Sequence, residues 1–227
     1  MVRVITGKTG ISHIVWDWNG TLLDDIGACV ETINRMLLRR SLPALDAARY
    51  REVFGFPVRN CYLVLGFDLE REDWDAVARE FHDHYAEVST DVGLRSGAEP
   101  VLRRLHENGT PMSILSACEV ELLDRMMWRC GVQTLFDRVY GLTDRYAHSK
   151  LDLARRLLAD LRLPADAILM VGDTTHDYEV SAELGFQCVL VAGGHQSEER
   201  LNRCGCRVLS GPDRLADWLP HAGLVSG

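Results

Sequence analysis

Lysine is scarce in this chain of 227 residues, because Lys8 and Lys150 are its two lysines among 25 basic residues. Asp and Glu number 33, so the net charge is -8 and the pI lies near 5.5. A protein that binds nucleic acid or an anionic membrane needs a basic surface, since its cations must replace the counterions of the phosphates. We therefore expect no nucleic-acid partner and no membrane partner, whereas a small phosphorylated ligand needs only a locally positive site.

Long apolar runs are also missing. No stretch approaches the ~20 apolar residues of a membrane-spanning helix, and the N-terminal sequence MVRVITGKTG is too short and too polar for a signal peptide. The seven cysteines are odd in number and scattered, unlike the disulfide framework of a small secreted protein. Cys204-Gly205-Cys206 lacks the two-residue spacing of a zinc or redox pair. We therefore expect reduced thiols and a cytoplasmic localisation.

Short apolar runs alternate with amphipathic helical stretches along most of the chain. This alternation is typical of an α/β fold, with a doubly wound, mostly parallel, Rossmann-like sheet covered by helices on both faces. The expected strands are His13-Asp17, Met112-Ser116, Arg138-Gly141, Ile168-Val171, Cys188-Val191 and Arg207-Leu209. The expected helices include Pro100-Asn108, Glu119-Cys130 and Leu151-Leu161; Gly109 and Gly131 follow the first two.

Residues 23–96 contain no convincing strand. One helical face is marked by Val30, Ile33, Leu37 and Leu38, and another by Trp74, Val77, Phe81, Tyr85 and Val88. We therefore expect a small helical domain at 23–96, inserted into a core domain formed by 1–22 and 97–227. Its expected hinges are Leu23-Asp24-Asp25 and Arg95-Ser96-Gly97.

Polar residues follow the expected strands at the sheet edge where catalysis on parallel sheets is expected. They are Asp17, Ser116, Lys150, Asp173 and Asp177. Phosphoryl transfer needs a nucleophile, a divalent metal and hydrogen-bond donors around the transferred group. An aspartate is already ionised at neutral pH, and clustered carboxylates supply the hard oxygens that Mg²⁺ prefers.

The order and spacing of these residues resemble the four signatures of the haloacid dehalogenase-like hydrolase superfamily. The first signature is Asp17-Trp18-Asn19-Gly20-Thr21-Leu22, and the last is Gly-Asp-x-x-x-Asp around Asp173 and Asp177. The resemblance implies that Asp17 forms an aspartyl-phosphate, that Ser116 and Lys150 hold the phosphoryl group, and that the cofactor is Mg²⁺. The metal ligands it implies are Asp17, the backbone carbonyl of Asn19, Asp173 and Asp177; the substrate-binding residues are Trp18, Gly20, Thr21, Ser116 and Ala117.

The helical insert resembles the cap of the phosphoglycolate phosphatase-like subgroup, which closes over small phosphorylated metabolites. Arg59 is the candidate in this insert for reading the substrate. The insert contains no lysine, which argues against the related phosphonate hydrolases, because they use a cap lysine to form a Schiff base. Haloacid dehalogenases need no magnesium and lack the carboxylate pair represented here by Asp173 and Asp177.

Asn19 departs from the family pattern, since the phosphatases usually carry a second aspartate there as general acid and base. An amide donates a hydrogen bond but delivers no proton, and general acid-base catalysis is typically worth ~10² to 10⁴ in rate. The substrate could have a good leaving group, or Asp24, Asp25 or a cap residue could serve as the acid. Otherwise the protein is a catalytically weak phospho-ligand-binding or regulatory protein.

Each candidate residue also has a purely structural interpretation. Ser116 could cap the helix expected near Glu119, and Asp173 and Asp177 could cap the helix after their strand. His176 is expected at a surface helix start, and Trp18 is expected to pack at the sheet edge. The combination favours a magnesium-dependent phosphatase of small phosphorylated metabolites, with Asp17, Asn19, Ser116 and Lys150 in catalytic positions.

Overall fold

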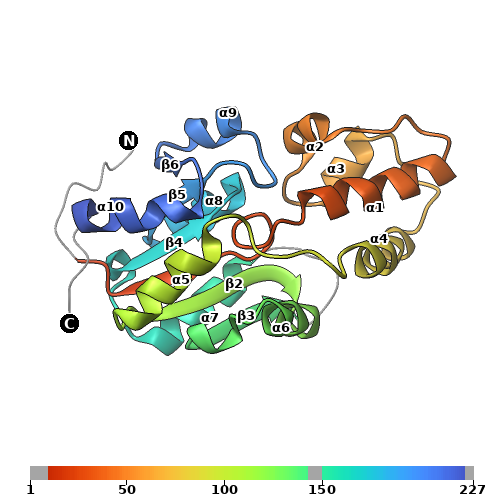
Figure 1. Ribbon diagram of the computed structural model, residues 1–227. Helices are drawn as coiled ribbons and strands as arrows, with labels where there is room; N and C mark the ends of the chain where they lie inside the picture. The colour runs from red at the N-terminus through yellow and green to blue at the C-terminus, as the bar shows by residue number, and fades with distance from the viewer. Residues whose placement is uncertain (1–9, 143–149, 223–227) are drawn as a thin grey trace.

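The computed structural model describes residues 10–142 and 150–222, with side chains to Leu219. Its sheet has six strands in the order β3-β2-β1-β4-β5-β6, and each neighbouring pair is parallel. The first strand therefore lies at the centre, and the strand order reverses beside it, as Figure 1 shows. This is the expected doubly wound, Rossmann-like α/β fold, and that prediction is confirmed.

The elements follow the chain in strict alternation outside the helical insert. The strands are β1 (His13–Trp16), β2 (Met112–Glu119), β3 (Arg138–Leu142), β4 (Ile168–Gly172), β5 (Gln187–Val191) and β6 (Arg207–Leu209). The helices of the sheet are α5 (Ala98–Glu107), α6 (Val120–Arg129), α7 (Leu151–Leu161), α8 (Thr175–Leu184), α9 (Glu198–Leu201) and α10 (Leu215–Ala222). Four 3-10 turns join them: η1 (Gln133–Leu135), η2 (Ala165–Ala167), η3 (Asn202–Cys204) and η4 (Pro212–Arg214).

Both faces of the sheet are covered, which explains why its central strands are mostly apolar. Ile14 and Trp16 of β1 pack into one cluster with α5, α6 and α10, whereas Val15 packs into another with α7 and α8. Successive side chains of a strand point to opposite faces, so a strand between two helical layers is apolar at most positions. None of the helices in the described residues is long and apolar enough to cross a membrane.

The insert consists of α1 (Ile26–Arg39), α2 (Ala47–Val53), α3 (Arg59–Val64) and α4 (Trp74–Val88). These helices form their own lobe beside the sheet (Figure 1), around a separate hydrophobic cluster that includes Ile33, Met36 and Tyr85. The chain enters and leaves the lobe through adjacent segments, because Leu23 and Leu94 form an antiparallel bridge.

Two local expectations need correction. Leu38 was expected on the buried face of its helix, but it is 79% exposed, because the apolar stripe of α1 runs through Ile33, Met36 and Leu37 instead. The helix expected from Pro100 begins two residues earlier, at Ala98, after Gly97 in the left-handed conformation (φ 79°). The expected ends at Gly109 and Gly131 are confirmed, since both glycines have positive φ just after a helix.

Candidate active site

Three buried carboxylates and one lysine meet at the carboxyl edge of the sheet. Asp17 follows β1, Asp173 follows β4, and Asp177 lies in the first turn of α8. Oxygens of these carboxylates lie within 4.8 Å of one another. The ammonium of Lys150 contacts Asp17 Oδ1 at 2.7 Å and also pairs with Asp177 Oδ1. The structure therefore brings four of the expected site residues together: Asp17, Lys150, Asp173 and Asp177.

The charges in this cluster do not balance. Burial raises the pKa of Asp17 well above its usual value, although Lys150 opposes this shift. Burial likewise raises the pKa of Asp173. Burial also opposes ionisation of Asp177, but Lys150 outweighs it and lowers that pKa. When all three carboxylates are ionised, the single charge of Lys150 leaves two excess negative charges in the cluster, and burial opposes them.

The donor set of this cluster fits a hard divalent cation. Mg²⁺ prefers carboxylate and carbonyl oxygens, and the excess negative charge of three carboxylates beside one lysine is of the sign that it would neutralise. Asp17, Asp173 and Asp177 are the residues that would hold it. Such an ion supplies charge stabilisation for a transferred phosphoryl group.

The turn after β1 is held by its own hydrogen bonds. Thr21 Oγ1 donates to Asp173 Oδ1 at 2.7 Å and lies 3.3 Å from Asp17 Oδ2, so it joins two of the carboxylates. Gly20 has φ 72°, and a Cβ there would lie 2.4 Å from Asp173 Oδ2, so this position requires glycine. The N–H of Gly20 donates to Asp25 Oδ1 at 2.9 Å and is thus already engaged.

Trp18 has its indole fully buried in the sheet cluster. Its side chain therefore packs in the core, as the structural interpretation expected, and only its backbone faces the turn.

Asn19 joins a buried polar cluster that the sequence did not reveal. Its Nδ2 donates to Asp25 Oδ2 at 2.8 Å and lies 3.2 Å from Tyr85 Oη. Tyr85 donates to the same Asp25 oxygen at 2.8 Å. His195 Nε2 lies 3.2 Å from Asp25 Oδ1, and its Nδ1 is 2.7 Å from Tyr50 Oη. The amide of Asn19 is therefore fixed toward Asp25 and the helical lobe.

The charges of Asp25 and His195 stabilise each other. Burial alone would lower the pKa of His195, but Asp25 outweighs it and raises this pKa to about 9. Burial alone would raise the pKa of Asp25, but His195 and the donors of Asn19 and Tyr85 lower it. The one sequence signal for His195 was its place in the loop directly after β5, at the same sheet edge as Asp17.

Ser116 and Ala117 lie beside Asp17 and line the same cavity. The hydroxyl of Ser116 accepts a hydrogen bond from Cys118 N at 3.1 Å, so it shapes the end of β2, whereas Glu119 occupies the N-cap position of α6. The expectation that Ser116 caps this helix is therefore wrong.

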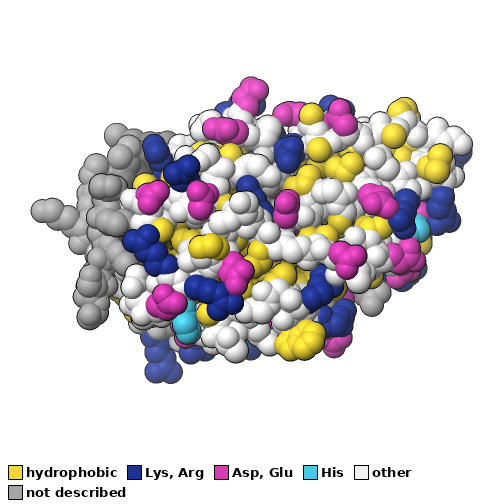
Figure 2. Space-filling view, in the orientation of Figure 1, with side chains coloured by type: hydrophobic (Ala, Val, Ile, Leu, Met, Phe, Trp, Pro, Cys, Tyr) yellow, Lys and Arg dark blue, Asp and Glu magenta, His cyan; other side chains and the backbone are white. Residues whose placement is uncertain are grey.

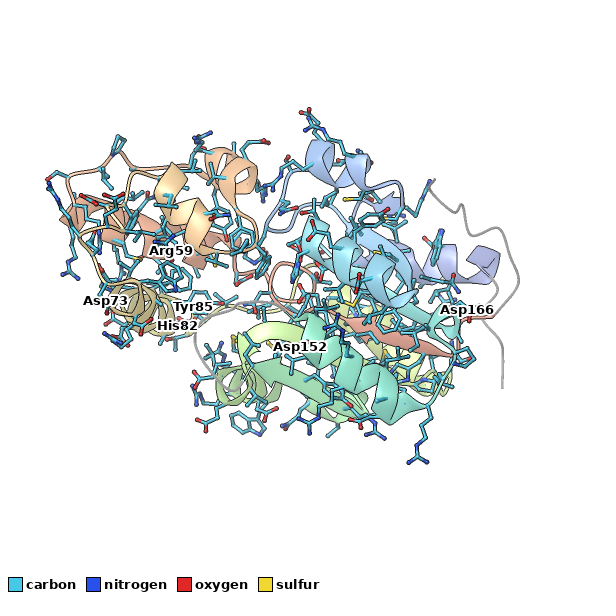
Figure 3. All side chains as sticks on the ribbon, turned by 180° about the vertical axis from the view of Figure 1, so that it is seen from behind. Arg59, Asp73, His82, Tyr85, Asp152 and Asp166 are labelled. Atoms are coloured by element: carbon cyan, nitrogen blue, oxygen red, sulfur yellow. The ribbon has the colours of Figure 1, made fainter. Side chains whose placement is uncertain are left out.

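Arg59 and His176, which the sequence also singled out, lie outside the cluster of Asp17, Lys150, Asp173 and Asp177. Arg59, the candidate reader of the substrate, is exposed at the start of α3 and does not line the cavity. In Figure 3, Arg59 lies on α3 farther from the sheet, whereas Tyr85 extends from α4 toward it. His176 is not an exposed surface histidine, since its ring stacks on Phe56 of the lobe with centroids 4.6 Å apart.

A cavity of about 150 Å³ lies between the sheet edge and the helical lobe. Its floor includes Asp17, Ser116 and Lys150, so the candidate nucleophile faces it directly. Its other walls come mainly from the lobe and are largely aromatic; they include Tyr50, Phe54, Phe56, Tyr62, Trp74, Phe81 and Tyr85.

Comparisons with known proteins identify the family of this chain. The sequence profile described as haloacid dehalogenase-like hydrolase matches residues 14–191. The tyrosine-protein kinase PtkA of Mycobacterium tuberculosis is 23% identical over 198 residues, which cover 87% of this chain and 67% of that protein. A phosphoglycolate phosphatase of Xanthomonas campestris is 27% identical over 188 residues, which cover 81% of this chain and 84% of that protein.

The fold has clear counterparts among solved structures. The haloacid dehalogenase-like hydrolase family protein SP0104 from Streptococcus pneumoniae superposes with a TM-score of 0.80. The match covers 92% of this chain and 98% of that chain, at 20% sequence identity, and so supports the fold alone. Because the family profile spans most of the chain, from β1 to the end of β5, this protein belongs to the haloacid dehalogenase-like hydrolase family.

Proposed function

We propose that this chain is a magnesium-dependent phosphatase of small phosphorylated metabolites that acts through an aspartyl-phosphate on Asp17. The observation that carries the proposal is the contact of the buried Asp17 carboxylate with Lys150 at 2.7 Å, beside Asp173 and Asp177 and open to the cavity. A nucleophile held by a cation, next to a set of hard oxygen ligands, is what phosphoryl transfer requires.

The residues divide the reaction between them. A carboxylate oxygen of Asp17 attacks the phosphorus, so the Asp17–phosphoryl bond forms while the bond to the alcohol oxygen breaks, and the departing alkoxide takes up a proton from water. Ser116 donates a hydrogen bond to a phosphoryl oxygen, and Lys150 offsets the charge of the phosphoryl group and of Asp17. Water then cleaves the aspartyl-phosphate and releases inorganic phosphate. The helical lobe, residues 23–96, acts as a cap that excludes bulk water from this step.

Asn19 has two roles in this proposal. Its backbone carbonyl is a further metal ligand, as the family resemblance implies. Its side chain donates to Asp25 and delivers no proton to the leaving oxygen. Esters with good leaving groups should therefore react faster than simple alkyl phosphates.

Steady-state hydrolysis tests the proposal, with 4-nitrophenyl phosphate and 2-phosphoglycolate as substrates; the second is chosen because a relative is a phosphoglycolate phosphatase. We expect turnover with Mg²⁺ that is lost with EDTA and falls by at least about 10³-fold in Asp17→Asn. Asp75→Asn is the matched control, because Asp75 is an exposed carboxylate of α4 that does not line the cavity. Turnover that survives in Asp17→Asn would contradict the proposal.

A second candidate function rests on the hydrogen bonds of Asn19. Because this amide is committed to Asp25 and Tyr85, the chain could bind a phosphorylated ligand with little turnover. That function predicts phosphate binding by calorimetry in both the native protein and Asp17→Asn, with no phosphate released from either ester.

A further inference from the structure

The inference concerns the alcohol part of the substrate and rests on the proposed phosphatase function. From the cavity lining, we infer that the substrate is a phosphate monoester whose alcohol part carries an aromatic or similarly apolar ring. The phosphoryl group lies at the polar floor beside Asp17, and the ring fills the space under the helical lobe.

The walls of the cavity are apolar where the alcohol part would lie. Aliphatic side chains complete the aromatic wall, among them Ile33, Val58 and Leu65 from the lobe and Leu122 from α6. Aromatic rings favour edge or offset contacts with another ring, which add to the gain from burial. A hydroxylated or charged alcohol would lose water here and gain few partners.

Two of the three tyrosines in the wall already use their hydroxyls in hydrogen bonds. Tyr50 Oη is bonded to His195, and Tyr85 Oη donates to Asp25. These two residues therefore present their rings to the cavity and keep their hydroxyls in the buried cluster. Both oxygens of Asp25 are likewise engaged within the cluster, by Asn19, Tyr85 and the N–H of Gly20.

A second anionic group on the substrate finds few cationic side chains in the lining. The described residues that line the cavity include no arginine, one lysine, Lys150, and two histidines, His82 and His195. Lys150 already pairs with Asp17 and Asp177, and His195 pairs with Asp25. A carboxylate such as that of 2-phosphoglycolate would face aromatic rings, which disfavours it.

The size of the cavity limits the alcohol part to about one ring at most, because the phosphoryl group shares the same space. Its volume is about 150 Å³. A protein cavity of about this volume lined by Leu, Ile and Phe binds benzene. Figure 2 shows acidic and basic side chains mixed with hydrophobic ones across one outer face.

The test compares substrates that share an alkyl leaving group, so that leaving-group chemistry does not decide the result. They are benzyl phosphate, methyl phosphate and 2-phosphoglycolate. We expect kcat/KM for benzyl phosphate to exceed that for each of the others by about tenfold or more, since one methylene in an apolar pocket already changes this ratio by about 10 to 200-fold. Equal values, or a preference for 2-phosphoglycolate, would overturn the inference while leaving the phosphatase function intact.

Matched variants locate the preference in the cavity. Leu65→Asn places a polar side chain of similar shape in the wall, and Ala78→Leu fills part of the cavity from α4. Both variants should lower the ratio of kcat/KM for benzyl phosphate to kcat/KM for methyl phosphate by at least about threefold. Leu63→Asn is the control, because Leu63 lies two residues before Leu65, in α3, but is 46% exposed and does not line the cavity. A ratio that is unchanged in both cavity variants would contradict the inference.

Absence of hydrolysis for all three esters would overturn the proposed function. In that case, calorimetry with benzylphosphonate and methylphosphonate tests the cavity alone. Tighter binding of benzylphosphonate by about tenfold supports the apolar site, and equal affinities overturn it.

Discussion

At position 19 the structure gives a physical reason for asparagine. The amide donates to a buried carboxylate, Asp25, which an ionised aspartate at position 19 could not do. Two buried carboxylates in contact would instead repel each other, and one would take up a proton. The departure from the family pattern is thus coupled to Asp25, a residue that follows six positions later.

We expect Asn19→Asp to lower the free energy of unfolding by about 1 to 3 kcal/mol, because it removes a donor to a buried charge. In the double variant Asn19→Asp/Asp25→Asn, the donor and acceptor exchange places, and part of this loss should be recovered. The double variant should also hydrolyse alkyl phosphates faster, since a carboxyl group then stands at position 19. Urea unfolding and steady-state assays measure both effects. A single variant as stable as the native protein would contradict this explanation.

The sequence predicted which residues end the strands but not how their side chains pair. Asp17, Lys150 and Asp177 are found together because parallel strands bring their carboxyl ends to one edge. The pairing of His195 with Asp25 could not be predicted, since it depends on the path of the loop after β5. Arg59 was singled out as a cation in a glycine- and proline-containing loop, yet the start of α3 turns it outward.

At the scale of the elements, the strands were easier to predict than the helix starts. All six strands lie where the apolar runs indicated, because burial on both faces leaves a strong pattern. Helix α5 begins earlier than expected, because Gly97 adopts a left-handed conformation that its sequence neighbours do not reveal. His13, the first residue of β1, links the stability of the protein to pH.

His13 is 3% exposed, and its Nε2 lies 2.9 Å from Ser113 Oγ on β2. Burial disfavours its charged form and lowers its pKa to about 4. The unfolded chain takes up this proton near pH 6.5, so stability falls as the pH drops from about 6.5 to about 4. At about pH 4 and below, the lowered pKa of His13 should reduce the free energy of unfolding by roughly 3 kcal/mol.

His13→Gln should remove this acid-dependent loss while keeping a polar group near Ser113. Urea unfolding at about pH 7 and about pH 4 measures the difference in the free energy of unfolding between the two pH values. The native protein is the reference for all other titrating groups. The loss between the two pH values should be smaller in the variant. An equal loss in both proteins would show that His13 carries no such linkage.

At the scale of the whole molecule, the lobe is held against the sheet by hydrogen bonds to backbone carbonyls. Arg200 Nη1 donates to the carbonyl oxygens of Arg51 and Phe54 at 2.8 and 2.6 Å. Gln196 Nε2 donates to the same Phe54 oxygen at 3.1 Å. The helical insert was predicted from the missing strands at 23–96, but these contacts were not, because a carbonyl oxygen leaves no sequence signal.

We expect Arg200→Met to loosen the lobe, because its donors to the end of α2 are lost while most of its apolar stem is kept. KM should rise by about threefold to tenfold, and amide exchange in α2 should become faster. Arg203→Met is the matched control, since Arg203 lies three residues away and pairs only with the exposed Glu199 among the interactions described. Identical exchange rates in both variants would contradict a closing role for Arg200.

The most direct test of the account is to find where the phosphoryl group goes. The native protein is mixed with 4-nitrophenyl phosphate and Mg²⁺, quenched in acid within the first turnover, and digested for mass spectrometry. We expect one phosphoryl group on the peptide that contains Asp17, and none in Asp17→Asn. Release of nitrophenol without a phosphorylated peptide, or with the phosphoryl group on another residue, would contradict Asp17 as the nucleophile.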